Sequence, residues 1–314
     1  MSGTNFPNGV SSRGVPLPAD NSFAGWWGSN IWFVDGDNGS DSNDGKNPDS
    51  AYASVAQAIS ASAAYDTIYV RPRVPDTDAS DPKVYAENQT IPYAKHHLSL
   101  ISTSNTSRVS QCGAWLKSSA AGYVVDVYAS GFSLENFAIH NSAGASGTGG
   151  IYLRSLSGYT TAAGSVGSEI VNCFIRYGDS GTEAGVYMIG GYHSVIEGCT
   201  FISNVTSIYM TGSTLIGRAH QIKNCNFMSH TGTSTANAMV SLAGSLTEVL
   251  IRDCHFDQGT LFIDASGAVD GLVSNCYFQD GAITPSDGGA AIDTGSGSLD
   301  IVGCYDQAGI VQEA

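Results

Sequence analysis

The chain has 314 residues and a formal net charge of -15, and its Lys and Arg residues are scattered rather than gathered in a stripe. Direct binding to DNA or RNA is therefore not expected, because nucleic-acid contacts need clustered positive charge. With 42% hydrophobic residues, only 13% charged residues and 38 glycines, the composition favours a β-rich fold with many tight turns. The first residues lack the pattern of an export signal, and no run of about eighteen apolar residues predicts a membrane span.

The first thirty residues form an irregular segment with three prolines and no repeat. A segment of this composition cannot bury enough apolar surface to make a core of its own. It is either a terminus that lies along the rest of the chain or an extended arm that becomes ordered on a partner. In the second case the contacts should come from Asn5, Phe6, Pro7, Val10, Arg13, Val15, Pro16, Leu17, Trp26 and Trp27.

The stretch TNFPNGVSSRGVPL in this segment resembles the opening of small capsid-associated structural proteins of tailed phages. The resemblance implies that the arm binds the major capsid protein or another virion protein. It also implies assembly in the bacterial cytoplasm and a final location in the virion, which agrees with free thiols.

A strand, a polar loop, a short helix and a second strand are predicted between residues 31 and 73. Ser54 and Gln57 make a capping box, which places the start of the helix. One narrow face of this helix would consist of Val55, Ala58, Ile59 and Ser62. We expect the helix to cover the open end of a β-solenoid, where backbone edges would otherwise pair with other chains.

The same region carries FVD followed by GSDSNDG, then SVxxAI, then DTIYVRP. This pattern closely resembles the first coil of pectate-lyase-like β-helix proteins, and Tyr85, Glu87, Ile91 and the segment Leu98 to Ile101 continue it. The resemblance implies a right-handed parallel β-helix. It is weak for function, since that architecture carries lyases, hydrolases, epimerases, adhesins and inert virion parts.

A short motif returns six times in the C-terminal half: an apolar residue, any residue, then Asn, Asp or Gly, then Cys. The copies are IVNCFI (170–175), VIEGCTF (195–201), QIKNCNF (221–227), LIRDCHF (250–256), LVSNCYF (272–278) and DIVGCYD (300–306). Their cysteines are 22 (254 to 276) to 29 (225 to 254) residues apart, and LENFAI (134–139) is an earlier copy with Phe137 in the Cys position. This spacing fits coils of several short strands better than leucine-rich repeats, whose Leu frame is absent.

Equivalent residues of such coils stack about 4.8 Å apart, which predicts one inward ladder of thiols. Its members would be Cys173, Cys199, Cys225, Cys254, Cys276 and Cys304. We interpret them as free thiols that pack in the core, because their spacing does not suit a zinc site. The preceding residues should turn corners in a left-handed backbone conformation, as at Asn136, Asn172, Asn224, Asp253 and Asn275.

No catalytic residue, metal ligand or cofactor site is predicted from these motifs. The outward positions beside the corners form a mixed set that is typical of a solvated strand face: Glu135, Glu197, Lys223, Arg252 and Ser274. The seven histidines share no position in the repeat. One loop is rich in acidic residues and consists of Asp35, Asp37, Asp41, Asn43 and Asp44. Its oxygen-bearing side chains could bind calcium, although their spacing is not that of an EF-hand.

One weak pair of carboxylates stands out. Asp264 and Asp293 occupy comparable positions in nearby coils, with Asp253 near the intervening corner. A glycoside hydrolase needs two carboxylates about 5–10 Å apart, a separation that neighbouring coils can supply.

The sequence therefore predicts an anchoring arm (1–30) and an all-β domain (31–314) that is a right-handed parallel β-helix with a capping helix. Our first hypothesis is a non-enzymatic phage capsid decoration protein, expected as a homotrimer, with weak adhesion to surfaces or glycans. The second is a tailspike-like depolymerase that cleaves polysaccharide by hydrolysis or elimination. A third, a secreted adhesin or lyase, is disfavoured by the missing export signal. Two carboxylates beside aromatic side chains in a groove would favour the enzyme.

Overall fold

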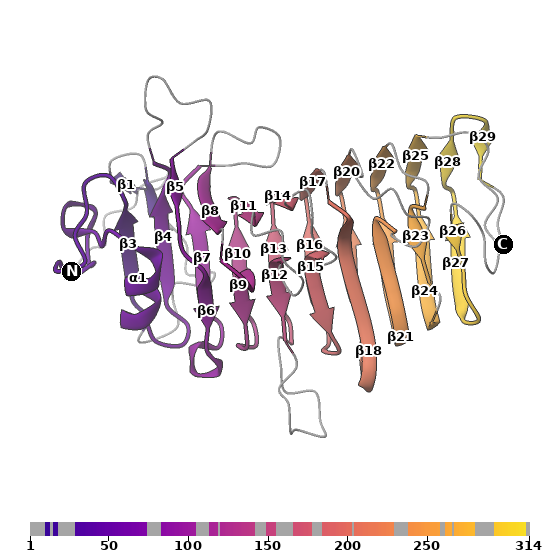
Figure 1. Ribbon diagram of the computed structural model, residues 1–314, viewed down its shortest axis with the longest axis horizontal. Helices are drawn as coiled ribbons and strands as arrows, with labels where there is room; N and C mark the ends of the chain where they lie inside the picture. Colours follow the sequence, from indigo (N-terminus) through magenta and orange to yellow (C-terminus); the bar gives the residue numbers. More distant parts are fainter. Residues whose placement is uncertain are drawn as a thin grey trace, which may run out of the picture.

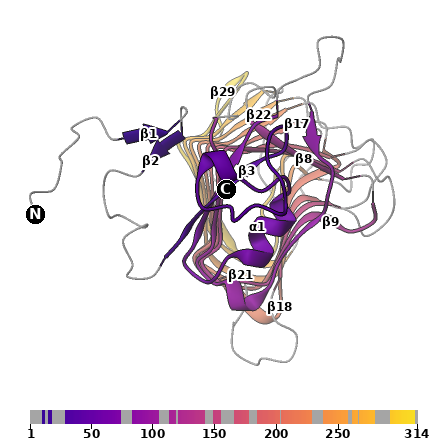
Figure 2. The ribbon, with the colours of Figure 1, turned by 90° about the vertical axis from the view of Figure 1, so that its left-hand side faces the viewer.

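Successive strands pair in parallel with strands one coil further along the chain, so the polypeptide winds into an elongated solenoid (Figure 1). This computed structural model describes residues 10–12, 15–17, 29–73, 83–104, 113–118, 120–141, 149–154, 166–177, 184–202, 204–228, 238–257, 261–265, 267–279 and 292–311. The predicted fold class is confirmed, because the chain is a right-handed parallel β-helix with a short α-helix at one end. Seen along the axis, the coils superpose around a common core (Figure 2).

Most coils contribute one strand to each of three faces. Face 1 consists of β6 (Gln89–Ile91), β9 (Tyr123–Val127), β12 (Gly149–Leu153), β15 (Ala184–Ile189), β18 (Thr206–Arg218), the first half of β21 (Val240–Arg252), β23 (Ile263–Asp264) and β26 (Ile292–Asp293). Face 2 consists of β3 (Ile31–Asp35), β4 (Thr67–Arg71), β7 (Ser99–Ser102), β10 (Ser133–Glu135), β13 (Glu169–Val171), β16 (Val195–Glu197), β19 (Gln221–Lys223), the second half of β21, β24 (Ala268–Ser274) and β27 (Ser298–Val302). Face 3 consists of β5 (Val84–Tyr85), β8 (Ala114–Ser118), β11 (Phe137–Asn141), β14 (Phe174–Tyr177), β17 (Thr200–Ile202), β20 (Asn226–Met228), β22 (His255–Asp257), β25 (Tyr277–Gln279), β28 (Tyr305–Asp306) and the antiparallel β29 (Gly309–Ile310).

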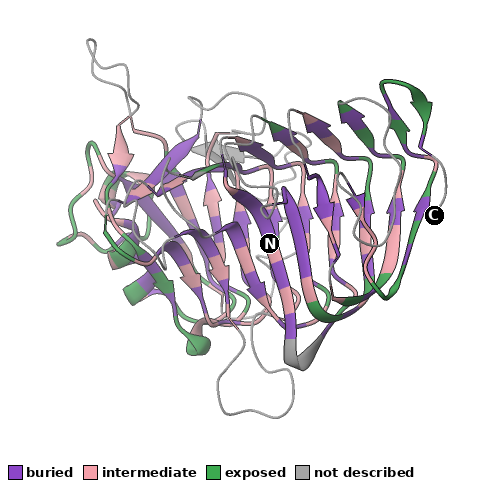
Figure 3. Ribbon diagram, turned by 45° about the vertical axis from the view of Figure 1, so that its right-hand side comes forward, coloured by how far each residue is buried: buried purple, intermediate pink, exposed green. Residues whose placement is uncertain are grey.

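Buried positions recur from strand to strand along the solenoid (Figure 3), and their apolar side chains form one continuous core. On face 2 one column of buried apolar residues runs through Trp32, Ile68, Leu100, Leu134, Ile170, Ile196, Ile222, Ile251, Val273 and Ile301. On face 3 the rings of Phe201, Phe227 and Phe256 stack with centroids 5.0 and 4.6 Å apart. Because a strand alternates its side chains, every second residue supplies the core and the others face outward.

The predicted thiol ladder is confirmed. All six cysteines of the motif are buried and free, and each Sγ donates to the carbonyl oxygen two residues earlier at 3.2–3.7 Å. Burial raises the pKa of the Cys199 thiol, which keeps it protonated. These cysteines therefore act as small core residues with satisfied S–H groups.

The corner between faces 2 and 3 is turned by one residue in the left-handed region, as predicted. Its φ angle is 64° at Asn136, 52° at Asn172, 54° at Asn224, 55° at Asp253 and 53° at Asn275, and glycines occupy the same place at Gly198 and Gly303. Short polar side chains tolerate this conformation better than other residues that carry a Cβ.

Replacing Asn224 with Ala should lower the free energy of unfolding by about 1–2 kcal/mol, because alanine adopts the left-handed conformation at a cost. Asn224→Gly should be nearly neutral, since glycine populates that region freely. Urea unfolding of both variants checks this. Equal stability of the Ala and Gly variants would contradict the role of backbone conformation at the corner.

The α-helix α1 (Val55–Ala61) covers the N-terminal end of the solenoid, as Figure 2 shows. Ser54 Oγ accepts a hydrogen bond from the Gln57 amide at 3.2 Å, which confirms the N-cap, and Glu87 Oε1 accepts from the Val55 amide at 2.9 Å. The expected face of the helix is buried against β3, β4 and β6. Two short 3-10 helices, Pro48–Ser50 and Tyr93–Lys95, lie in the connecting loops.

Only part of the predicted arm lies within the described residues. Strands β1 (Val10–Ser12) and β2 (Val15–Leu17) form an antiparallel pair and, among the described strands, pair with nothing else. Four of the residues expected to contact a partner, namely Val10, Val15, Pro16 and Leu17, lie in this pair. The other six lie outside the described residues, namely Asn5, Phe6, Pro7, Arg13, Trp26 and Trp27. No described helix is long and apolar enough to cross a membrane.

One buried histidine makes stability depend on pH. Only 1% of His220 is exposed, and burial lowers its pKa to about 4, although hydrogen bonds with the backbone of Gly190 and Gly191 oppose the shift. An unfolded histidine has a pKa of about 6.5, so the unfolded chain takes up this proton first as the pH falls. The stabilisation is therefore complete above pH 6.5 and is lost as the pH approaches 4.

We expect His220 to contribute a loss of up to about 1.4 kcal/mol in unfolding free energy per pH unit over this range. His220→Gln should remove that contribution, because an amide does not titrate. Urea unfolding between pH 7 and pH 4.5 measures it, with His96→Gln as a control at a less buried histidine. An unchanged pH slope in His220→Gln would mean that this side chain is not held neutral.

Candidate functional site

A groove of about 920 Å³ lies on the outer side of face 2. Its floor comes from four consecutive strands, β4, β7, β10 and β13, and is lined by Thr67, Tyr69, Ser99, Ile101, Ser133, Glu135 and Glu169. Because neighbouring strands lie about 4.8 Å apart, four strands give the groove a length of about 14 Å along the axis. This shape suits a short stretch of an extended polymer.

The wall of the groove is the corner that precedes face 2, where a column of residues has positive φ angles. In order along the axis the column contains His97 (57°), Gly131 (66°), Gly167 (66°), His193 (56°) and Ala219 (56°). A Cβ added at Gly131 would lie 2.2 Å from His97 Nδ1, whereas one added at Gly167 would have no heavy atom within 4 Å. The hollow thus exists because glycine interrupts a column of side chains, and a histidine stands on either side of the interruption.

Two carboxylates from neighbouring coils face this hollow. Ser133 pairs with Glu169 across β10 and β13, so Glu135, two residues further along, is the diagonal neighbour of Glu169. Parallel strands lie about 4.8 Å apart and rise about 3.3 Å per residue, so the Cα atoms of these diagonal neighbours are about 8 Å apart, a separation at which both carboxyl groups can reach one bound molecule.

The environment of Glu135 favours its protonated form. Burial first, and then the negative charge of Glu169, raise the pKa of Glu135, while a 3.5 Å contact from Asn136 Nδ2 opposes the shift. Glu169 lines the same groove and is exposed. A neighbouring pair whose environments differ in this way is the arrangement that a general acid and a general base require.

Aromatic side chains flank the carboxylates at one end. Tyr69 is half-buried in the groove floor, and its ring stacks on Phe33 of the preceding strand with centroids 6.1 Å apart. Burial and the charge of Glu135 raise the pKa of Tyr69, so its hydroxyl stays protonated. The groove therefore combines an apolar ring, a hydroxyl donor and two carboxyl groups.

The outward-facing residues that precede the corners between faces 2 and 3, which were predicted to form a solvated strand face, lie in two different environments. Lys223 forms an ion pair with Glu197 at 2.9 Å, and Arg252 lies 3.3 Å from Asp253, as expected for a solvated strand face. Glu135 differs, because it lines the groove and its burial raises its pKa. The interpretation as a solvated face therefore holds for the ion pairs but not for Glu135.

Asp264 and Asp293 are neighbours, as the sequence suggested, since they pair directly between β23 and β26 on face 1. Ser241 Oγ lies 3.4 Å from Asp264 Oδ2, and Asp293 Oδ1 accepts from the Gly295 amide at 2.9 Å. Asp253 lies at the corner between faces 2 and 3 and does not join them. The contacts of these aspartates with their own strands and turns explain them as structural residues.

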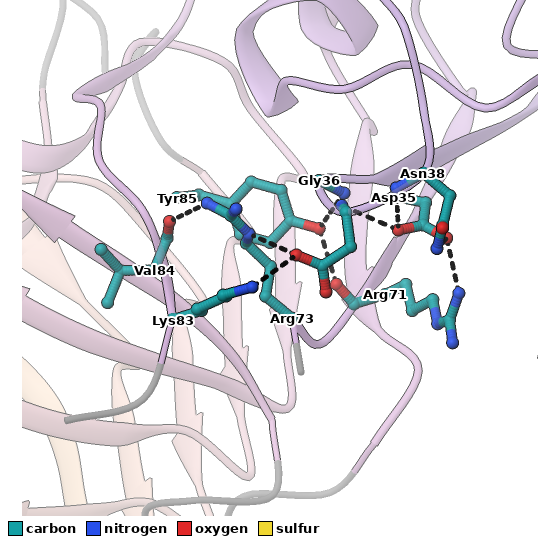
Figure 4. Close-up of polar contacts among 9 residues, drawn as sticks. Asp35, Gly36, Asn38, Arg71, Arg73, Lys83, Val84 and Tyr85 are labelled. Atoms are coloured by element: carbon teal, nitrogen blue, oxygen red, sulfur yellow. Dashed lines mark hydrogen bonds and ion pairs between the residues drawn. The ribbon is translucent and has the colours of Figure 1, made fainter. Parts of the chain in front are cut away.

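The acidic loop is bonded to the protein at each of its five positions. Asp35 forms an ion pair of 2.6 Å with Arg71 (Figure 4). Asp37 forms ion pairs with Arg73 and Lys83, at 3.1 and 3.8 Å. The other three bond within the loop and its surroundings, Asp41 to Ser54, Asn43 to the Ala51 carbonyl and Asp44 to Ser50. Among the described residues, no group of three or more His, Cys, Asp or Glu side chains could hold a metal ion.

Tyr85 locks this loop to the first coil. Its hydroxyl donates to the Arg71 carbonyl at 2.6 Å and accepts from the Gly36 amide at 3.0 Å (Figure 4). Burial raises the pKa of Tyr85, which keeps the donor in place. The region is therefore a structural closure of the first coil.

Sequence reasoning missed Glu169, and its statement that the histidines share no position in the repeat is wrong for His97 and His193, which occupy the same corner position two glycines apart. Glu169 begins a strand that follows an insertion, residues 155–165, which hides its position in the repeat. The available signal was the column of corner residues, in which two glycines stand between histidines. That column becomes visible only when the coils are aligned in space.

No protein-family model matches this sequence, and no curated protein sequence matches it. Solved structures of similar fold include a rhamnogalacturonan lyase (16% identity, 88% of this chain and 74% of the other, TM-score 0.52). They also include a pectin methylesterase variant in complex with a hexasaccharide (13% identity, 90% of this chain and 90% of the other, TM-score 0.52). A pectate lyase is similar too (14% identity, 89% of this chain and 77% of the other, TM-score 0.50). At these identities the likeness shows the fold alone: this chain shares the parallel β-helix of these polysaccharide-acting enzymes.

Proposed function

We propose that the groove on face 2 binds a linear polysaccharide and that Glu135 and Glu169 hydrolyse it. The observation that carries the proposal is a pair of carboxylates from neighbouring coils in one groove, with the pKa of Glu135 raised by burial and by Glu169. Enzymes of the same fold that act on polysaccharides support it by analogy. The proposal takes up the second of the hypotheses drawn from the sequence.

In this mechanism Glu135 is the general acid. It donates its proton to the glycosidic oxygen as the bond to the anomeric carbon breaks, so the leaving sugar departs as an alcohol. Glu169 removes a proton from the water that attacks the anomeric carbon, which completes hydrolysis with one water consumed. Tyr69 supplies a ring surface and a hydroxyl that orient the sugar beside the pair.

A substitution that places a side chain in the hollow, and leaves both glutamates unchanged, tests the proposal. Gly167→His would continue the histidine column into the groove, in a backbone conformation that His97 and His193 already adopt. Binding and cleavage, measured by calorimetry and by release of reducing ends from a panel of polysaccharides, should be lost. Ala219→His is the matched control, because it lies in the same column outside the groove.

Three outcomes decide the proposal. Loss of binding in Gly167→His, with Ala219→His unchanged and both variants folded by circular dichroism, supports it. Full activity of Gly167→His contradicts it. Absence of binding and cleavage by the unaltered protein over the panel also contradicts it, and leaves the non-enzymatic decoration protein as the function to pursue.

We also propose that residues 1–30 attach the β-helix to a phage capsid through the major capsid protein or another virion protein, in a homotrimer. The pairing of β1 and β2 only with each other among the described strands supports an arm that is separate from the solenoid. Co-sedimentation of full-length and Δ1–30 protein with capsid shells tests it. Shell binding that persists after the deletion contradicts the arm as anchor.

A further inference from the structure

The charges of the groove point to one class of glycan. Its lining contains two carboxylates, Glu135 and Glu169, and no Lys or Arg. Apart from Arg13 and Arg108, all Lys and Arg residues of the sequence lie in the described part of the chain, and none of these lines the groove, whose only other ionisable nitrogen groups among the described residues are those of His97 and His193. Proteins that recognise sugar carboxylates use such cations, because a guanidinium or ammonium group neutralises the bound anion.

Cations near this face are already paired with protein carboxylates. Arg71 bonds to Asp35 at 2.6 Å at the end of β4, and Lys223 bonds to Glu197 at 2.9 Å three strands beyond β10. A uronate in the groove would therefore lie beside the carboxylate of Glu169 with no Lys or Arg in the lining to compensate, in a partly buried site where salt screens poorly. Any ionisation of Glu135 would add a second negative charge next to it.

The remaining lining suits neutral sugars. Thr67, Ser99 and Ser133 present hydroxyl groups that donate and accept hydrogen bonds without carrying charge. Tyr69 and Ile101 present apolar surface to the carbon-bound faces of a ring. Sugars that carry only hydroxyl groups match both features.

We infer that the groove selects a glycan of neutral sugars and rejects polymers of uronic acids. This inference rests on the proposed polysaccharide binding and adds the substrate class. It also separates this chain from a pectate-type substrate, which consists of uronates.

The experiment compares matched polymers. A panel of uronate polysaccharides, each beside its carboxyl-reduced counterpart, differs only in a carboxylate against a hydroxymethyl group. Every pair that binds should show at least tenfold tighter binding of the reduced form, measured by calorimetry at about 0.1 M salt. Equal or tighter binding of the uronate form would overturn the inference while leaving polysaccharide binding intact. No binding of any polymer would overturn the proposed function and this inference with it.

A charge-inserting variant gives a second readout. Ser133→Lys places an ammonium group in the groove floor, beside Glu169 in the neighbouring strand. It should raise uronate binding relative to the reduced polymer by about tenfold. Ser274→Lys, on the same face outside the groove, should leave the preference unchanged, and an equal effect of both variants would contradict a local origin of the selectivity.

Discussion

Replacing Glu135 with Gln should slow glycan cleavage by about 10²–10⁴-fold, because an amide has no proton to give to the leaving oxygen. Burial and the charge of Glu169 raise the pKa of Glu135 and so favour the protonated form that acts as the acid. Binding of the polymer should persist, since the amide group has nearly the same shape as the carboxyl group that it replaces. Initial rates and calorimetric affinities measured on the same preparations check both statements.

The pH dependence tests the role of Glu135 as the acid. Burial and the charge of Glu169 raise the pKa of Glu135, and the rate should fall at higher pH as Glu135 loses its proton. In Glu135→Gln this alkaline limb should disappear. Asp300→Asn makes the same chemical change on β27, far along face 2, and should leave the rate unchanged. A near-normal rate in Glu135→Gln would show that another group supplies the proton.

Replacing Phe227 with Ala should lower the free energy of unfolding by about 3–5 kcal/mol. The ring is fully buried and stacked between Phe201 and Phe256, with centroids 5.0 and 4.6 Å away. Backbone pairing of β17, β20 and β22 holds the coils at a fixed spacing, so the cavity cannot collapse. The loss of unfolding free energy should therefore include the full cost of the cavity that the ring leaves behind.

Met228→Ala is the matched control, because the next side chain on the same strand points outward and is 39% exposed. Its effect should stay within about 0.5 kcal/mol. Urea unfolding of both variants at pH 7 provides the comparison. A loss in Phe227→Ala no larger than that in Met228→Ala would mean that the stacked ring column does not support the coil.

The fold was readable from the sequence because a solenoid repeats its local chemistry. Most coils place a small core residue directly after a left-handed corner, so a cysteine preceded by Asn, Asp or Gly recurs in the motif, as at Asn224 and Cys225. The capping helix was readable for a similar reason, since Ser54 and Gln57 act within a single turn. Contacts between residues close in sequence leave their signature in the order of residues.

The groove depends on how separate coils are placed in space. Glu135 and Glu169 are 34 residues apart (169 minus 135), beyond the 22 to 29 residues between cysteines of the repeat, because residues 155–165 lie between them. Sequence reasoning therefore assigned Glu135 to an open surface and overlooked its partner. Only the stacking of coils sets the register of β10 and β13.

By itself the sequence determined an all-β solenoid, its inward columns, its corners and its cap, because these depend on contacts within a coil or between identical positions of the repeat. The position of the groove depends on the assembled coils, because a glycine makes a hollow only where its neighbours in the adjacent coils carry side chains. Gly167 becomes a hollow only when His193 stands beside it in the next coil, and Glu135 and Glu169 line one groove only once their coils are stacked. Burial and charge proximity are properties of the assembled stack, and they turn a glutamate on a strand face into a candidate acid.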